Sequence, residues 1–294
     1  MHGPHPAPPS QETLGHQPRR PIKSPSQRSK LGYLPAKLLG GSLLLDQERP
    51  WTDHYGPSVR KTIDAPQHRT LGDFITAKAA EFADLPAFTA CMPNGMNGTL
   101  TYRQADEMSD ALAVYLREIA GLSAGDRVAI QVPNGLSYPV AAMAIFKAGC
   151  VLVNVNPLYT SEEMVKQFKD AEPKAIFIVD MFTDKLAEAI QDYPISNVIV
   201  TRVAEYLPAM PRGIVGLVQK YWDKTIHPID IPHIRLPEAV NAGRKQQKGG
   251  RDDLEAYRSK IDPDDVACLQ YTGGTTGVSK GAMLTHTNIL MNME

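Results

Sequence analysis

The sequence predicts an α/β fold in which a parallel-rich sheet is flanked by helices. Short apolar runs rich in β-branched residues alternate with stretches of helical length between residues 127 and 201. Strands that are apolar throughout are buried on both faces, and each parallel neighbour is reached through a crossover that is usually helical. The 294 residues are 43% hydrophobic, which is enough for a sizeable core.

The first regular element that we expect is a helix beginning after Thr101. Thr101 and Gln104 form a capping-box pattern, in which each side chain bonds to the backbone N–H of the other residue. Gly121 and Gly125 end this helix. Its buried face is expected to comprise Ala105, Met108, Leu112, Tyr115, Leu116 and Ile119.

Alternating strands and helices follow this first helix. Pro133 and Pro157 stop the first two strands, and a second capping box at Thr160 and Glu163 opens a helix. Because the alternation is uninterrupted, we expect the strands to be parallel. The expected strands are 127–132, 150–155, 174–179 and 197–201, and the expected helices are 136–147, 160–170 and 183–191.

Residues 202–262 lose this rhythm. They carry scattered prolines, a short apolar patch at 213–222 and a polar stretch at 243–253. We therefore expect an irregular connection across the surface that includes one helix at most. Regular structure returns at 266–271, where an apolar run predicts another strand.

The first 50 residues differ from the rest in composition. They are rich in proline, and six Lys or Arg residues lie between positions 19 and 37 without an acidic residue among them. This predicts a disordered, basic tail over residues 1–50, followed by one domain over 51–294. The alternatives are an organelle transit peptide and a surface anchor built on Leu38, Leu39 and the leucines at 43–45.

The net charge, the longest apolar stretch and the spacing of the cysteines narrow the class of protein. With 31 basic and 32 acidic residues the formal net charge is -1, so no global field attracts nucleic acid. The apolar stretch 136–155 is interrupted by Pro139, Lys147 and Gly149, so we expect no transmembrane segment. The three cysteines lie far apart and are expected to be reduced thiols: Cys91, Cys150 and Cys268.

A glycine-rich and hydroxyl-rich run, Tyr271 to Gly281, follows the last predicted strand. It contains four glycines, four Ser or Thr hydroxyls and one lysine, Lys280. Glycine permits positive φ and lets successive backbone N–H groups approach phosphate oxygens closely. The hydroxyls can donate to those oxygens or ligate Mg²⁺, and the lysine adds a mobile positive charge. The run therefore predicts a phosphate-binding loop.

Two other interpretations of this run remain open. A glycine-rich turn between strands would need two or three of the glycines, although not the lysine. Ser279 also lies in a G-x-S-x-G pattern, the nucleophile elbow of α/β-hydrolases, but His286 and Glu294 follow in the wrong order and too closely. Because Ser279 precedes Lys280, the run is not the nucleotide signature G-x-x-x-x-G-K-[ST].

The segment from Leu269 to His286 resembles the phosphate-binding signature of the AMP-forming acyl-CoA synthetases in the adenylate-forming superfamily. It reads Leu-Gln-Tyr-Thr-Gly-Gly-Thr-Thr-Gly-Val-Ser-Lys-Gly-Ala-Met-Leu-Thr-His. The resemblance extends over roughly residues 51–294 and is greatest to bacterial long-chain fatty acid CoA ligases. Four further segments carry it, in the same order: Leu100-Thr-Tyr-Arg, Gly125-Asp-Arg-Val-Ala-Ile, Val132-Pro-Asn and the segment from Lys147 to Thr160.

This resemblance implies a two-step reaction. A fatty acid carboxylate attacks the α-phosphate of ATP, which gives an acyl-adenylate and pyrophosphate, and coenzyme A then displaces AMP. Thr272 is expected to contact Mg²⁺, and both Thr272 and Lys280 are expected to be catalytic. For His286 and Asn288, helix capping is favoured over catalysis. The nucleotide-binding residues are expected to be Tyr271, Thr272, Gly273, Gly274, Thr275, Thr276, Gly277, Ser279 and Lys280.

The sequence also departs from the family. Complete members carry a later Tyr-Gly-x-Thr-Glu motif, a ribose-binding Asp and an adenylation lysine on a separate C-terminal domain, none of which occurs here. We therefore expect an N-terminal fragment that is inactive alone, with a non-catalytic remnant or another adenylate-forming ligase as alternatives. The expected partners are ATP, fatty acid and coenzyme A, with a homodimer allowed for. The expected location is the cytoplasm, with peripheral contact at the inner face of the membrane.

Overall fold

The chain divides into two compact units, residues 1–62 and residues 63–294. The computed structural model describes residues 50–60, 62, 64–91, 95, 97–208, 213–214, 229–247, 251–272 and 279–293. In the first unit, the described part contains the short 3-10 helix η1 (Pro50–His54). Residues 1–49, which make up almost all of the predicted tail, lie outside the described residues.

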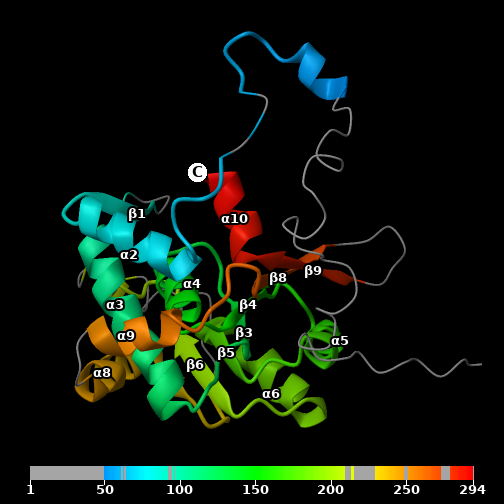
Figure 1. The fold of residues 1–294 in the computed structure, drawn as a ribbon. Helices are drawn as coiled ribbons and strands as arrows, with labels where there is room; N and C mark the ends of the chain where they lie inside the picture. Colours follow the sequence, from blue (N-terminus) through cyan, green and yellow to red (C-terminus); the bar gives the residue numbers. More distant parts are fainter. Residues whose placement is uncertain are drawn as a thin grey trace, which may run out of the picture. The chain divides into compact units, whose positions relative to one another are not determined.

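The second unit is built on a seven-stranded sheet with the order β7-β6-β5-β3-β4-β8-β9 (Figure 1). Every neighbouring pair is parallel except β8 and β9, which are antiparallel. The predicted parallel-rich sheet is confirmed. The strands are β3 (Arg127–Gln131), β4 (Val151–Asn154), β5 (Ala175–Val179), β6 (Asn197–Thr201), β7 (Ile234–Arg235), β8 (Val266–Thr272) and β9 (Lys280–Thr285).

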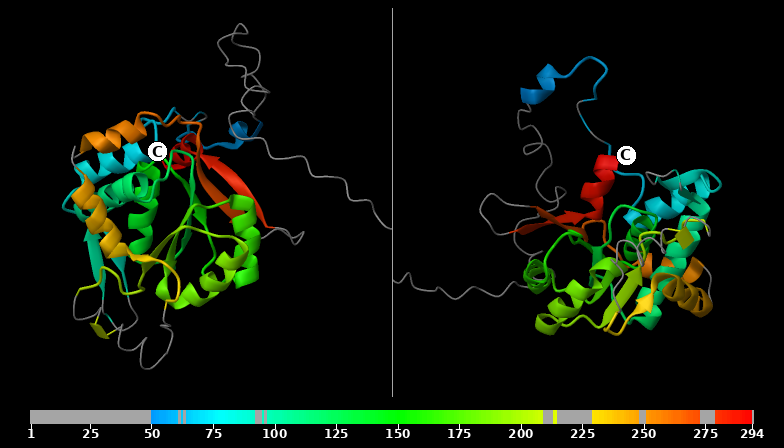
Figure 2. Two further views of the ribbon diagram at one scale, coloured as in Figure 1. Left: turned by 90° about the horizontal axis from the view of Figure 1, so that it is seen from below. Right: turned by 180° about the vertical axis from the view of Figure 1, so that it is seen from behind.

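Helices cover both faces of this sheet (Figure 2). One face packs on α3 (Tyr102–Val114) and α4 (Ser137–Lys147), and the other packs on α5 (Ser161–Ala171) and α6 (Thr183–Asp192). Along β5, Phe177 faces the first layer whereas Ile176 and Ile178 face the second, as the two-residue period of a strand requires. The continuous apolar runs of the sequence are therefore strands buried on both faces.

Both predicted capping boxes are present. The Thr101 hydroxyl accepts from the Gln104 N–H at 3.2 Å while the Gln104 side chain accepts from the Thr101 N–H at 3.0 Å. Thr160 and Glu163 make the same reciprocal pair at the start of α5. After α3 the chain continues as a single π-helical turn, η2 (Tyr115–Ile119). Ile119 ends this wider turn, where side chains no longer follow the α-helical period, and it is 47% exposed rather than buried as predicted.

The prediction of an irregular connection over 202–262 was wrong. The described part of this region contains β7 and two helices, α8 (Leu236–Gln246) and α9 (Arg251–Arg258). Helix α8 runs through Gly243 and packs this residue against α3. A Cβ at this position would lie 1.8 Å from the Ala111 carbonyl oxygen, so glycine is needed for the close approach. The apolar patch 213–222 lies mostly outside the described residues.

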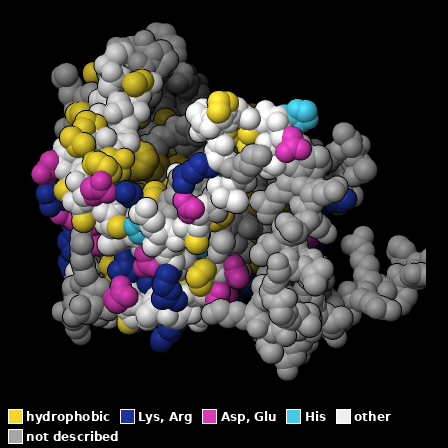
Figure 3. Space-filling view, turned by 45° about the horizontal axis from the view of Figure 1, so that its top comes forward, with side chains coloured by type: hydrophobic (Ala, Val, Ile, Leu, Met, Phe, Trp, Pro, Cys, Tyr) yellow, Lys and Arg dark blue, Asp and Glu magenta, His cyan; other side chains and the backbone are white. Residues whose placement is uncertain are grey.

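The remaining elements lie at the edges of the unit. A two-stranded antiparallel hairpin, β1 (Pro86–Ala90) and β2 (Gly98–Thr101), precedes α3. Helix α2 (Leu71–Glu81) packs on α3 and α4, and α10 (His286–Met293) follows β9. Among the described residues, none of the helices is long and apolar enough to cross a membrane. Over the described part of the face in Figure 3, charged side chains of both signs are interspersed.

A buried lysine holds the first helical layer together. Lys147 of α4 is fully buried, and its Nζ donates to Asp106 Oδ1 at 2.6 Å and to Asp110 Oδ1 at 2.5 Å, both on α3. It also donates to Ser109 Oγ at 2.9 Å. A buried ammonium is tolerated only when paired and hydrogen-bonded, which these contacts provide.

Candidate active site

The predicted phosphate loop joins β8 to β9. The two strands pair in register, with Thr272 opposite Lys280 and Tyr271 opposite Gly281. Directly opposite residues of an antiparallel pair share one face of the sheet. The Thr272 and Lys280 side chains therefore lie side by side where the loop leaves the sheet, and both residues are exposed. A hairpin is the topology that the glycine-turn alternative assumed, but that alternative has no use for this lysine.

The predicted site residues Gly273, Gly274, Thr275, Thr276 and Gly277 lie outside the described residues. Ser279 is described, and its hydroxyl donates to the Thr272 carbonyl oxygen at 3.2 Å. This bond closes the base of the loop and holds the chain on either side of it together.

Tyr271 is fixed on the face of the sheet that α5 covers. Its hydroxyl donates to Asp170 Oδ2 of α5 at 2.6 Å. Its ring lies over Gly281, where a Cβ would be 2.9 Å from Tyr271 Cζ. The pKa of Tyr271 is raised, first by burial and then by the hydrogen bond to Asp170 and the charge of that carboxylate. The hydroxyl therefore keeps its proton and remains a donor.

Gln270 is fixed on the opposite face of the sheet. Its Oε1 accepts from Asn154 Nδ2 at 2.9 Å, and Asn154 Oδ1 accepts from the Tyr138 hydroxyl at 2.8 Å. Asn154 ends β4 and Tyr138 lies in the first turn of α4. The last two residues before Thr272 are thus each tied to a different helical layer.

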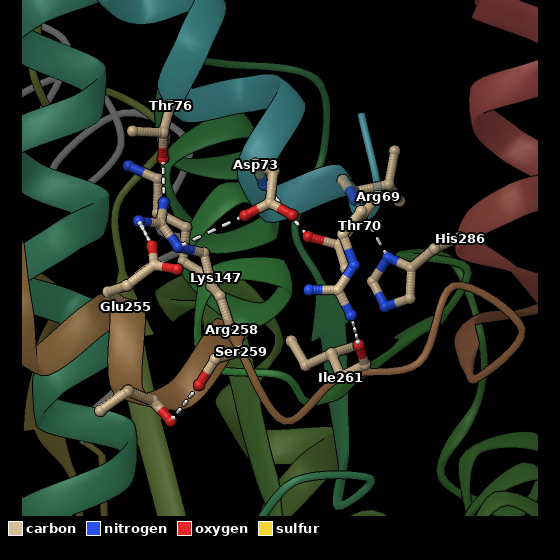
Figure 4. Close-up of polar contacts among 12 residues, drawn as sticks. Arg69, Thr70, Asp73, Thr76, Lys147, Glu255, Arg258, Ser259, Ile261 and His286 are labelled. Carbon is tan, nitrogen blue, oxygen red and sulfur yellow. Dashed lines mark hydrogen bonds and ion pairs between the residues drawn. The ribbon is translucent and has the colours of Figure 1, made fainter. Parts of the chain in front are cut away.

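His286 caps the start of helix α2 (Figure 4). Its Nδ1 accepts from the Leu71 N–H at 3.2 Å, at the start of α2. The residue is 2% exposed, and burial lowers its pKa, against smaller raising effects of Asp265 and Asp73. A neutral imidazole with an unprotonated Nδ1 is what this bond requires.

Asn288 is also a capping residue. Its Oδ1 accepts from the Thr285 N–H at 3.2 Å, while the Thr285 hydroxyl accepts from the Asn288 N–H at 3.1 Å. This reciprocal pair begins α10. The capping that the sequence favoured is therefore observed for both residues.

The hydrolase alternative finds no support in this geometry. Ser279 donates to a backbone carbonyl, and His286 is occupied by the amide at the start of α2. No hydrogen bond joins these two described side chains.

Two of the three cysteines, Cys150 and Cys268, are buried, and burial raises their pKa values to about 12 and about 11. Neither thiol is a ready nucleophile.

The described residues offer no ready-made metal cage. Among them, no group of three or more His, Cys, Asp or Glu side chains could hold a metal ion. The chemistry available at the base of the loop is the ammonium of Lys280 and the exposed hydroxyls of Thr272 and Ser279, of which the Ser279 hydroxyl donates to the Thr272 carbonyl oxygen. These groups suit a polyphosphate that brings its own Mg²⁺, since phosphate oxygens and waters supply most of the ligands of that ion. Thr272 as a metal ligand stays a prediction.

Sequence reasoning missed the residues that hold the loop from outside. Asp170 lies 101 residues from Tyr271 along the chain, and Asn154 lies 116 residues from Gln270. Asn154 lies in the segment from Lys147 to Thr160 that carries part of the family resemblance, but that segment assigned it no role, and Asp170 lies in none of the quoted segments. The parallel order of β4 and β8 brings the second pair together, and the packing of α5 beside β8 brings the first.

Comparison with known proteins agrees with the fold and the loop. The family described as AMP-binding enzyme matches residues 75–294. The chain is 38% identical over 247 residues to the long-chain-fatty-acid–CoA ligase of Escherichia coli O6:H1, which covers 84% of this chain and 42% of the relative. It is 33% identical over 253 residues to the enzyme of that name from Bacillus subtilis, covering 85% of this chain and 42% of the relative. The chain thus spans about two-fifths of these relatives.

Solved structures show the same fold. A long-chain-fatty-acid-CoA ligase from Archaeoglobus fulgidus superposes with a TM-score of 0.56 at 23% identity, covering 79% of this chain and 39% of that one. A fatty acyl-adenylate ligase from L. pneumophila, in complex with acyl adenylate and pyrophosphate, gives a TM-score of 0.51 at 22% identity, with 77% and 32% covered. With the family match over residues 75–294, these findings show that the chain belongs to the AMP-binding enzyme family.

Proposed function

We propose that this chain provides the nucleotide-phosphate half of a long-chain fatty acid CoA ligase. The whole enzyme would join a fatty acid to coenzyme A through an acyl-adenylate, with release of pyrophosphate and AMP. The observation that carries the proposal is the pairing of Thr272 with Lys280 at the mouth of the β8–β9 hairpin. The identity to ligases of this name supports the substrate class.

The role of Lys280 follows from charge. A carboxylate and the triphosphate of ATP are both anionic and repel each other, so the reaction needs positive charge near the phosphates. Lys280 is exposed beside the loop, free to follow the pyrophosphate as negative charge develops on it. Mg²⁺ brought with ATP would add to this charge and orient the phosphate oxygens.

Thr272 would act beside Lys280. Its hydroxyl belongs to the last residue of β8, so the sheet holds it while the loop beyond it adapts to the phosphates. It can donate to a phosphate oxygen or ligate the Mg²⁺ that accompanies ATP. The glycines at 273, 274 and 277 would supply backbone N–H groups to the same oxygens.

Location and membrane contact are part of the proposal. We propose that the protein is cytoplasmic and associates peripherally with the inner face of the membrane. The hydrophobic character of a fatty acid substrate is the support for this contact, because such substrates partition into the bilayer.

The test measures nucleotide and pyrophosphate binding by the chain, and its release of pyrophosphate. We expect Mg·ATP and magnesium pyrophosphate to bind, as measured by isothermal titration calorimetry, and Lys280→Ala to weaken pyrophosphate binding about 10- to 100-fold through loss of a charged contact. The matched control is Lys260→Ala, which removes an exposed lysine from the turn after α9. We expect no pyrophosphate release with ATP, palmitate and Mg²⁺, since the chain spans 42% of its relatives. Robust release, or pyrophosphate binding that ignores Lys280, would contradict the proposal.

A further inference from the structure

The strand that leads into the phosphate loop is held from both faces at its last residues. Gln270 is tied through Asn154 to Tyr138 on the α4 side, with distances of 2.9 and 2.8 Å. Tyr271 is tied to Asp170 on the α5 side at 2.6 Å. The residue that follows them is Thr272, which carries one of the two groups assigned to phosphate.

Tyr271 connects three elements rather than two. Its backbone belongs to β8, its hydroxyl reaches α5, and its ring covers Gly281 of β9. Gly281 directly follows Lys280, so the Tyr271 ring contacts the strand that carries Lys280. Any tilt of the hairpin relative to α5 would break the bond to Asp170 or lift the ring from Gly281.

We propose that Asp170 and Tyr271 form a brace that positions the phosphate loop, and that Tyr271 acts through this brace rather than by touching the nucleotide. Both are positioning residues. The inference rests on the proposed function, in that the loop positioned is the one assigned to phosphate. It changes the sequence-based expectation for Tyr271, which placed that residue among the nucleotide contacts.

The geometry explains why the hydroxyl is unavailable to a ligand. Its one proton is donated to a carboxylate, which makes a stronger bond than a neutral acceptor would. Tyr271 and Thr272 also point to opposite faces of β8, because successive side chains alternate along a strand. A nucleotide held by Thr272 and Lys280 therefore lies on the α4 side, and the phenol points to the α5 side.

The experiment uses the full chain and four variants. Tyr271→Phe keeps the ring over Gly281 and removes the hydroxyl, and Asp170→Ala removes the acceptor. The double variant tests whether the two act as one unit, and Asp170→Asn restores an acceptor of the same size. The control is Tyr193→Phe. Tyr193 packs on Phe168 of α5, on the same face of the sheet as Tyr271. Among the described residues, no hydrogen bond joins Tyr193 to β8.

Two readouts separate the brace from the proposed function. Amide hydrogen exchange over residues 266–285 reports the hairpin without any ligand, and calorimetry reports the affinity for magnesium pyrophosphate. We expect Tyr271→Phe and Asp170→Ala each to accelerate exchange at 279–282 and to weaken binding about fivefold, the scale of one hydrogen bond. The double variant should match the single variants, Asp170→Asn should recover most of both effects, and the control should leave both unchanged.

Other outcomes overturn one of the two proposals. Additive effects in the double variant, or unchanged exchange with a large loss of binding in Tyr271→Phe alone, would refute the brace and return Tyr271 to the nucleotide contacts. If the unaltered chain binds no pyrophosphate, the proposed function fails. In that case hydrogen exchange alone decides whether Asp170 and Tyr271 hold the hairpin.

Discussion

Replacing Lys147 by methionine is the sharpest test of what stabilises the first helical layer. The Lys147 side chain is 0% exposed, and the side chains of Asp106 and Asp110 are 3% and 9% exposed. Lys147→Met keeps most of the apolar stem but leaves two buried carboxylates without their ammonium. Removing one partner of a buried ion pair costs about 3–5 kcal/mol. With two carboxylates affected, we expect the free energy of unfolding to fall by about 5 kcal/mol.

The assay is urea denaturation followed by far-UV circular dichroism. With a slope of about 3 kcal/mol per molar urea, the expected loss lowers the midpoint by about 1.7 M. Adding Asp106→Asn and Asp110→Asn to Lys147→Met should recover most of the loss, because the charges are then removed together. As a surface control, Lys78→Met breaks the exposed pair with Glu81 and should change stability by less than about 0.5 kcal/mol. A loss below about 1 kcal/mol for Lys147→Met would refute this reasoning.

Two further predictions concern the helices. Gly243→Ala should destabilise the fold by about 3 kcal/mol in thermal or urea unfolding, because its Cβ would lie 1.8 Å from the Ala111 carbonyl oxygen, whereas Gly135→Ala, with its nearest atom at 3.8 Å, should be tolerated. Equal effects of the two changes would contradict this packing. His286 has a folded-state pKa below its ordinary 6.5, so its contribution to stability is present above pH 6.5 and is lost as the pH falls through the folded-state pKa. His286→Gln should flatten the dependence of the unfolding free energy on pH between 7 and 5, and an unchanged slope would show that the bond to Leu71 is not pH-linked.

Much of the fold follows from local patterns in the sequence. The apolar runs at 127–132, 174–179 and 197–201 predicted β3, β5 and β6 to within a residue of their observed ends. Two capping boxes marked where α3 and α5 begin. These features could be predicted because hydrophobic periodicity, helix capping and chain-breaking residues act over a few residues, and their energies are local.

The predictions failed where distant packing decides. Residues 236–246 fell within the predicted connection, yet they form α8, and Gly243 lets that helix approach α3 closely. Ile119 fits the helical period but becomes exposed where the π turn rotates the chain. The hydrophobic period of a helix and its glycine content do not indicate which distant residues will pack against it.

The candidate site divides in the same way. The sequence by itself indicated the hydroxyl and lysine chemistry of the loop, because Thr272 and Lys280 lie in one short segment that folds back on itself as a hairpin. Only the tertiary structure decided what holds that loop in place. Asp170 reaches Tyr271 across 101 residues, and His286 reaches Leu71 across 215. Such contacts depend on which strands and helices become neighbours, and that order arises from burying both faces of the sheet at once.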